Sequence, residues 1–87
     1  MDSPKLLKFP CDYPIKVMIR TEAEVRAAVD AAFATHAGAA VVAKAVARAS
    51  AQGNFTSVTY LLHARDEAHV AELFADLKLI PGVLMVL

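Results

Sequence analysis

One cysteine and three histidines have the most versatile side-chain chemistry in this sequence. Cys11 is the only cysteine, so no disulfide can form within the chain, which fits a reducing compartment. A reactive thiol needs a nearby cation or helix N-terminus that stabilises its thiolate form, whereas the adjacent Asp12 is negatively charged. None of the local motifs that mark a nucleophilic cysteine surrounds this position. We therefore do not expect Cys11 to be catalytic.

The histidines are candidates for a metal site that would also use Asp66 or Glu72. Structural zinc sites bring their ligands in closely spaced pairs, and neither an HxH nor an HxxxH pair occurs here. We expect His36 at the C-terminal end of a helix, where the helix dipole favours a cation, and His63 and His69 on the surface. We therefore expect no metal site.

No other constellation in the sequence is typical of an enzyme. We find no acid–base pair, no nucleophile–base pair and no phosphate-binding loop. The sequence therefore predicts a chain that is not an enzyme and that needs no cofactor.

Length and charge restrict the other classes of function. The 87 residues suffice for one domain, which we place at residues 13–87 after an N-terminal arm at residues 1–12. Nine basic residues balance nine acidic ones, so we expect neither nucleic acid nor an anionic membrane surface as a partner. The chain begins with no recognisable signal peptide and has no run of about 18 apolar residues. We expect a cytoplasmic protein.

Residues 13–20 alternate between two kinds of side chain, which is typical of a half-buried strand. Ile15, Val17 and Ile19 would face the core, and Lys16, Met18 and Arg20 would face the other way. A second alternating segment, rich in β-branched and aromatic residues, predicts a strand over residues 55–64.

Two helices are predicted between and after these strands. Thr21 and Glu24 have the spacing of a capping box, and Gly38 suits the left-handed position that follows a helix. Asp66 would cap the second helix, which Pro81-Gly82 would end. Val25, Val29, Ala32, Phe33 and His36 recur at helical spacing in the first helix, and the core face of the second would be Val70, Leu73, Phe74 and Leu77.

Residues 39–51 fit two structures. Their many alanines favour a helix, whereas the alternation of Val42, Lys44, Val46, Arg48 and Ser50 fits a strand. The turn signal Gln52-Gly53-Asn54 favours the strand, because a hairpin turn joins two strands. We therefore predict a strand over residues 40–50 and, with a last strand over residues 83–87, the order βαββαβ. This is an α+β, ferredoxin-like sandwich with a four-stranded antiparallel sheet and two helices on one face.

Three segments also resemble a known family. They are Phe-Pro-Cys-Asp-Tyr-Pro-Ile-Lys-Val-Met at 9–18, Gly-Asn-Phe-Thr-Ser-Val at 53–58 and Val-Leu-Met-Val-Leu at 83–87. In this order and spacing they resemble the YbeD-like family of small bacterial proteins of unknown function, over about residues 6–87.

The resemblance implies a sandwich similar to ACT regulatory domains, with residues 40–50 as the second strand. It implies no activity, because the family has none securely assigned. Genes of the family often neighbour lipoate-attachment genes in proteobacteria, which implies a regulatory role. This sequence has Ile19 where relatives often have glycine, which argues against a ligand close to the backbone there. Ala51-Gln52 replaces a common Ser-Lys and removes a positive charge.

The predicted sheet has one face that the two helices do not cover. That face would hold Lys16, Met18, Phe55, Ser57, Thr59, Leu61 and His63. We expect Met18, Phe55 and Leu61 to lie together on it, and exposed apolar patches usually mark interaction sites. The N-terminal arm or a second copy would be the simplest cover. The leading hypothesis is a non-enzymatic regulatory or protein-interaction module that uses the open sheet face or the sheet edge, with an unknown protein partner or a homodimeric state.

Two alternatives remain. A small-molecule-binding, ACT-like regulatory domain would hold its ligand at the loop Arg20, Thr21 and Glu22, where a helix N-terminus begins. An RNA-binding module of the same strand order would stack bases on aromatic side chains of the open face. The sequence places only Phe55 there, and Gln52 stands where a basic residue would be expected, so RNA binding is the least favoured.

Overall fold

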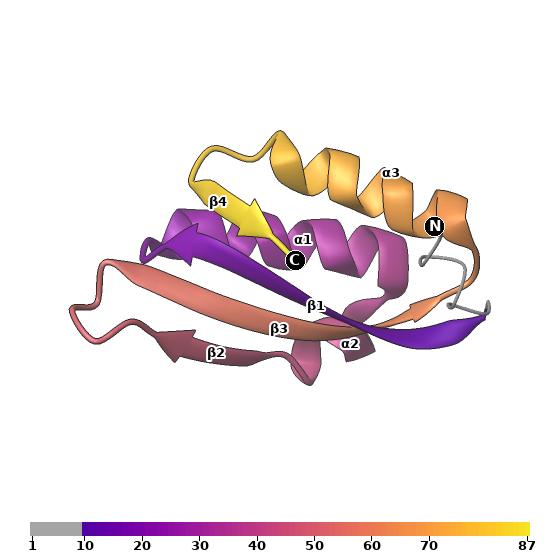
Figure 1. Ribbon diagram of the computed structural model, residues 1–87, viewed down its shortest axis with the longest axis horizontal. Coiled ribbons are helices and arrows are strands. Elements are labelled where there is room, and N and C mark those ends of the chain that lie inside the picture. Colours follow the sequence, from indigo (N-terminus) through magenta and orange to yellow (C-terminus); the bar gives the residue numbers. More distant parts are fainter. Residues whose placement is uncertain (1–9) are drawn as a thin grey trace, which may run out of the picture.

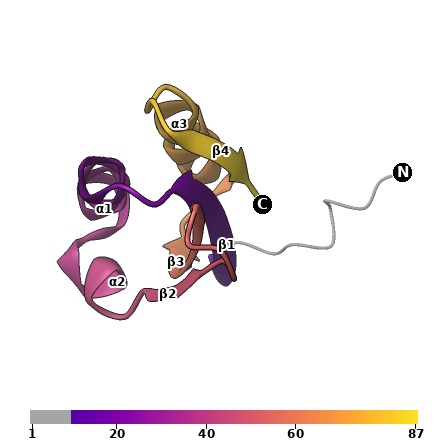
Figure 2. The same ribbon diagram turned by 90° about the vertical axis from the view of Figure 1, so that its left-hand side faces the viewer.

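The computed structural model describes residues 10–87. Four antiparallel strands form one sheet in the order β2-β3-β1-β4, which confirms the ferredoxin-like fold (Figure 1). In Figure 2, α1 and α2 lie to the left of the sheet. The elements are β1 (Cys11–Arg20), α1 (Ala23–Ala37), α2 (Ala39–Ala43), β2 (Val46–Ala49), β3 (Phe55–Ala64), α3 (Glu67–Lys78) and β4 (Val83–Val86).

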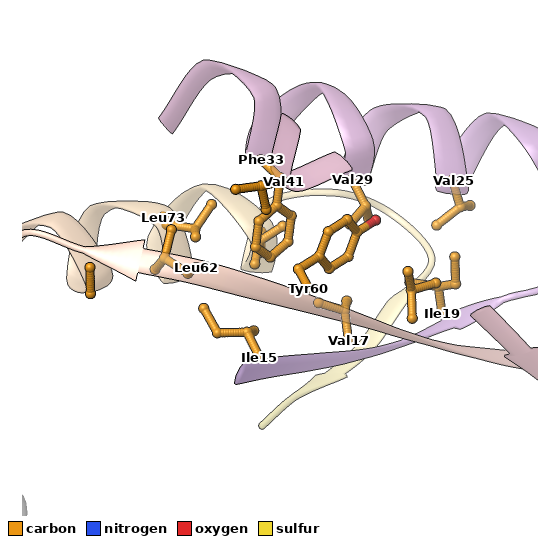
Figure 3. Close-up of a cluster of buried hydrophobic side chains, with 13 residues drawn as sticks. Ile15, Val17, Ile19, Val25, Val29, Phe33, Val41, Tyr60, Leu62 and Leu73 are labelled. Atoms are coloured by element: carbon orange, nitrogen blue, oxygen red, sulfur yellow. The ribbon is translucent and has the colours of Figure 1, made fainter. Parts of the chain in front are cut away.

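The core lies between the sheet and the helices and follows the predicted alternation. Ile15, Val17 and Ile19 of β1 are buried, and Ile15 and Val17 pair directly with Tyr60 and Val58 of β3. The residues between them point to the opposite face, because successive side chains of a strand alternate. Figure 3 shows the buried side chains of β1, β3, α1 and α3 meeting in one cluster.

Helix α1 has the predicted buried face but not the predicted cap. Val25, Val29 and Phe33 are buried. The capping box is wrong: the helix begins at Ala23 after an extended Glu22, and no side chain caps it. The Thr21 hydroxyl instead forms a 2.8 Å hydrogen bond with the Thr56 hydroxyl, which ties the end of β1 to β3.

The prediction of a strand over residues 40–50 is wrong for its first half. Ala39–Ala43 forms the short helix α2, and only Val46–Ala49 forms the strand β2. Gly38, at a positive φ of 93°, separates α2 from α1. Alanine favours a helix, and the turn of helix buries Val41 in the core, so both local preference and packing favour α2. The fold therefore has three helices rather than two.

Helix α3 begins as predicted. Asp66 Oδ1 accepts a 2.8 Å hydrogen bond from the backbone N–H of His69. Leu73 and Leu77 are buried, and Val70 and Phe74 pack partly buried against the core. Strand β4 then returns along β1 and forms the outer edge of the sheet.

The start of the domain also differs slightly from expectation. Strand β1 begins at Cys11, two residues before the predicted boundary at Tyr13. The remainder of the predicted arm, residues 1–9, lies outside the described residues. Within residues 10–87, no helix is long and apolar enough to cross a membrane.

Candidate functional site

The candidate site is the outer face, which we define as the sheet surface turned away from the helices. Alternation along β1 and β3 places all of the residues predicted for an interaction surface on it. These residues are Lys16, Met18, Phe55, Ser57, Thr59, Leu61 and His63.

One row of directly paired residues crosses the whole outer face. Met18 on β1 pairs with Ser57 on β3 and with Met85 on β4, and Ser57 pairs with Arg48 on β2. Neighbouring strands lie about 4.8 Å apart, so the row spans roughly 15 Å. Its side chains stand next to one another, which makes Met18 the centre of the face.

Apolar side chains gather around this centre. Phe55 is 44% exposed and Met85 49% exposed, and Leu84 joins Phe55 and Arg20 around one hollow. A bulge between β1 and β4 breaks the regular alternation after Met18, so both Leu84 and Met85 are exposed. The sequence did not reveal this, because the segment 83–87 is apolar throughout and has no alternation that would show which side chains are exposed.

The expectation that Leu61 lies beside Phe55 and Met18 is wrong. Leu61 pairs with Pro14, near the other end of the sheet. Six residues separate it from Phe55 along β3, which corresponds to about 20 Å. Sharing one face of a strand therefore did not place the two side chains in one patch. The apolar residues that do accompany Met18 and Phe55 come from β4.

A hollow of about 190 Å³ lies beside Met18 on the outer face. Met18, Arg48 and Phe55 line it together with Ser57. The hydroxyl oxygen of Ser57 is covered from solvent and has no hydrogen-bond partner among the described residues. The hollow thus combines apolar walls, a nearby cation and an unused polar group.

The exposed charges around the centre are positive. Lys16 and Arg20 flank Met18 on β1, and Arg48 occupies the same cross-strand row. All three are exposed, and none forms an ion pair with an acidic side chain of residues 10–87. The acid on this face, Asp12, is paired with His63 at the far end of the sheet.

The predicted ligand loop, Arg20, Thr21 and Glu22, lies between the start of α1 and the β2–β3 hairpin. It borders hollows of about 190 and 470 Å³. The Thr21 N–H donates to the Asn54 carbonyl at 3.2 Å, and the Glu22 N–H donates to the Arg20 carbonyl at 2.8 Å. These two amides are therefore unavailable to an anion, and the Glu22 carboxylate would repel one.

The histidines serve different elements. His63 is exposed, and His36 joins the end of α1 to α3 through a 2.6 Å contact between its Nε2 and Asp76 Oδ2. His69, predicted on the surface, is buried. Its Nδ1 accepts a 3.1 Å hydrogen bond from the Arg65 N–H, so Nε2 carries the proton and donates to the His36 carbonyl at 2.6 Å.

His69 is buried because the start of α3 packs against the end of α1, which the sequence pattern of α3 alone does not show. Among the side chains that the structure describes, no three His, Cys, Asp or Glu residues gather closely enough to hold a metal ion. The side chain of Cys11 is not among those described.

A hydrogen-bonded group on the helix side connects β3 to α1. The Tyr60 hydroxyl donates to Asp30 Oδ1 at 2.5 Å, and Arg26 Nε donates to both Asp30 oxygens at 3.1 Å. Burial, and then the hydrogen bond to Asp30, raises the pKa of Tyr60 above its ordinary value. The phenol therefore stays protonated and acts as a fixed donor. Phe33 stacks on its ring, with centroids 3.7 Å apart.

Comparison with known proteins supports the fold and gives the family. Over 86 residues the chain is 34% identical to a UPF0250 protein of Hahella chejuensis, covering 99% of this chain and 93% of the relative. It is 29% identical to a UPF0250 protein of Paraburkholderia phymatum, covering 94% and 92%.

A solved structure shares the fold: the C-terminal domain of the MgtC protein from Mycobacterium tuberculosis. The TM-score is 0.60 at 22% identity, over 93% of this chain and 88% of that domain. The family model described as "Protein of unknown function (DUF493)" matches residues 4–87. The chain therefore belongs to the DUF493 family, the small bacterial proteins of unknown function that its sequence resembles.

Proposed function

We propose that this chain is a non-enzymatic interaction module that binds another protein through the outer face of its sheet. The observation that carries the proposal is the distribution of exposed apolar side chains. Within residues 10–87, all of the large apolar residues that are exposed except Leu79 belong to β2, β3 or the C-terminal segment 83–87. Patches of this kind usually mark interaction sites on soluble domains.

The free energy of burial supports the same use. Each square ångström of apolar surface removed from water stabilises a complex by about 25 cal/mol. Phe55, Leu84 and Met85 each retain more than two fifths of their exposure, so a partner has apolar area to cover. The helix side offers less, because its large apolar side chains already fill the core.

The polar groups that the structure brings together support a non-enzymatic role. Tyr60, Asp30 and Arg26 satisfy one another between β3 and α1. Asp66 and His69 are both engaged in holding the start of α3. These groups are used in stabilising the fold, which leaves the outer face as the surface with unused binding capacity.

Capture of partners from a bacterial extract tests the proposal when two variants are compared. Met85→Asp places a charge next to Met18 on the outer face, whereas Leu79→Asp makes a similar change at an exposed residue beyond α3. We expect Met85→Asp to reduce the captured partner about tenfold or more, as loss of a central apolar contact does. Leu79→Asp should capture as wild type does. Equal capture by all three proteins would contradict the proposal.

A second candidate function, small-molecule regulation, rests on the hollow beside Arg20, Thr21 and Glu22. We favour this function less than protein binding. The backbone amides of Thr21 and Glu22 already form hydrogen bonds, and Ile19 is buried beside them. Thermal-shift measurements with amino acids, lipoate and nucleotides separate the two functions. A compound that stabilises wild type but not Arg20→Gln would support the ligand site.

A further inference from the structure

We propose that the partner presents an acidic polypeptide segment with interspersed apolar side chains to the outer face. This inference rests on the proposed function and concerns the chemistry of the partner. Lys16 and Arg20 lie two residues before and after Met18 on the same strand, which places each about 7 Å from it. Arg48 lies two strands away in the row of Met18, at roughly 10 Å.

Three cations therefore surround an apolar centre made by Met18, Met85 and Phe55. Except for Asp12, which is paired with His63, the acidic side chains of residues 10–87 belong to α1, α3 and the loops before them. The chain is neutral overall, and its basic residues occur on both sides of the sheet, because Arg26, Lys44, Arg65 and Lys78 belong to the helices or their loops. The outer face nevertheless has an excess of positive charge among the described residues, because its acid, Asp12, is paired with His63. A surface of this kind complements negative groups on a partner and steers their approach.

The hollow at the centre fits the same partner. Ser57 lines it, but its hydroxyl is covered from solvent, so the exposed Lys16, Arg20 and Arg48 are the groups that would meet a carboxylate. Met18 beside it is unbranched and polarizable, so it adapts to apolar side chains of different shapes. Carboxylates would lie over Lys16, Arg20 and Arg48, and an apolar side chain would enter between them.

A second copy of this chain fits the face poorly. Two copies docked face to face around a two-fold axis would bring together two surfaces that each carry the same three cations. Docking of the acidic helix side onto the outer face of the next copy is a head-to-tail contact, which forms rings or open filaments rather than a two-fold dimer.

Single-stranded nucleic acid also fits poorly. Its recognition by this kind of sheet uses aromatic side chains on which successive bases stack. Phe55 is the sole phenylalanine, tyrosine or tryptophan on the outer face among the described residues, since Tyr13, Tyr60, Phe33 and Phe74 contribute to the core side. The other aromatic ring of the face, His63, is paired with Asp12 near the far end of the sheet. The remaining large apolar side chains of the face are aliphatic or methionine, which suits polypeptide side chains.

The test is a residue-resolved NMR titration of the full chain with two matched peptides of about 12 residues, long enough to cross the sheet. One repeats Asp-Phe-Glu-Ala and the other Lys-Phe-Lys-Ala. We expect the acidic peptide to bind about tenfold or more tightly, as a few exposed charge pairs together produce, and to weaken as salt rises. The amide signals that move should be those of Met18, Ser57 and Arg48.

Paired variants complete the test. Lys16→Gln with Arg48→Gln should abolish the preference for the acidic peptide, and Lys44→Gln with Lys78→Gln, two exposed cations off the outer face, should preserve it. The proposal of an acidic partner would be overturned if the two peptides bound equally, if they bound away from the outer face, or if neither bound. Tighter binding of a 12-residue oligouridylate on this face, or a concentration-dependent dimer abolished by Met85→Asp, would overturn it also.

The two levels of the proposal fail in different ways. If Met85→Asp removes the partner captured from extract but the Lys16→Gln, Arg48→Gln double variant captures it fully at every salt concentration, the outer face is the binding site and the acidic chemistry is wrong. If Met85→Asp captures as wild type does, the proposed function itself is wrong.

Discussion

At the scale of single residues, Tyr60 connects the sheet to α1 by both packing and hydrogen bonding. It is fully buried, stacks on Phe33 and donates its hydroxyl to Asp30. The alternation of β3 predicts its burial, but nothing in the sequence shows that Asp30, four residues after Arg26 on a helix, receives the phenol. That pairing arises only when α1 is packed on the sheet.

Replacement of Tyr60 by phenylalanine tests this hydrogen bond. We expect Tyr60→Phe to lower the free energy of unfolding by about 1–2 kcal/mol at neutral pH, as loss of a buried hydrogen bond to a charged group does. Urea denaturation measures the change. Tyr13→Phe is the matched control, because no side-chain hydrogen bond of Tyr13 is formed among the described residues, and it should change stability little.

Comparison of wild type with Tyr60→Phe also predicts how the free energy of unfolding changes with pH. The pKa of Tyr60 is raised in the folded state, so folding favours the protonated phenol. Its contribution is therefore fully present below the ordinary tyrosine pKa of about 10 and is lost as the pH rises above it. Between pH 8 and 11, wild type should lose more stability than Tyr60→Phe; parallel curves would contradict the assignment.

His69 is a second residue whose importance the sequence concealed. Its Asp66-x-x-His69 spacing indicates the helix cap, but the direction of the imidazole depends on the end of α1. We expect His69→Ala to lower the free energy of unfolding by about 2–3 kcal/mol, because the Arg65 N–H and the His36 carbonyl both lose a partner. His63→Ala, at an exposed histidine, should cost less than about 1 kcal/mol. Comparable losses for both variants in thermal unfolding would argue against a special role for His69.

At the scale of elements, alternation and capping predicted most of the fold. β3 spans the predicted residues 55–64, and Asp66 caps α3 as expected. Residues 39–51 contain both of the structures that their sequence fits, first the helix α2 and then the strand β2. No single periodicity can describe such a segment. The bulge in β4 was equally hidden, because an apolar segment gives no alternation that could be seen to break.

The connection into β4 depends on a glycine for a reason that can be measured. Gly82 has a φ of 95°, and a Cβ there would lie 2.5 Å from Val25 Cγ2. Gly53 has a comparable φ of 76°, but a Cβ would meet nothing within 4 Å. We expect Gly53→Ala to cost about 1 kcal/mol from backbone strain alone. Gly82→Ala should cost about 1–3 kcal/mol more, because it also crowds a buried side chain. Equal costs in urea denaturation would show that the contact with Val25 relaxes freely.

At the scale of the whole molecule, the sheet separates two surfaces of different character. The helix side encloses the core and carries most of the acidic residues, whereas the outer face carries exposed apolar side chains and three cations. The parity of β1 and β3 predicted which residues lie on this face. It did not predict which of them lie together, because that depends on strand register and on the position of β4. As a result Met85 and Leu84, and not Leu61, lie near Met18.

Photo-crosslinking tests the central claim most directly. A photoreactive aromatic amino acid is introduced in place of Phe55 on the outer face and, as a control, in place of Leu79 beyond α3. Irradiation in bacterial cells should give an adduct with another protein from position 55 and none from position 79. Three results would contradict the claim that the outer face binds a protein partner. They are an adduct from position 79 alone, a crosslink from position 55 to the same chain only, and no adduct from either position.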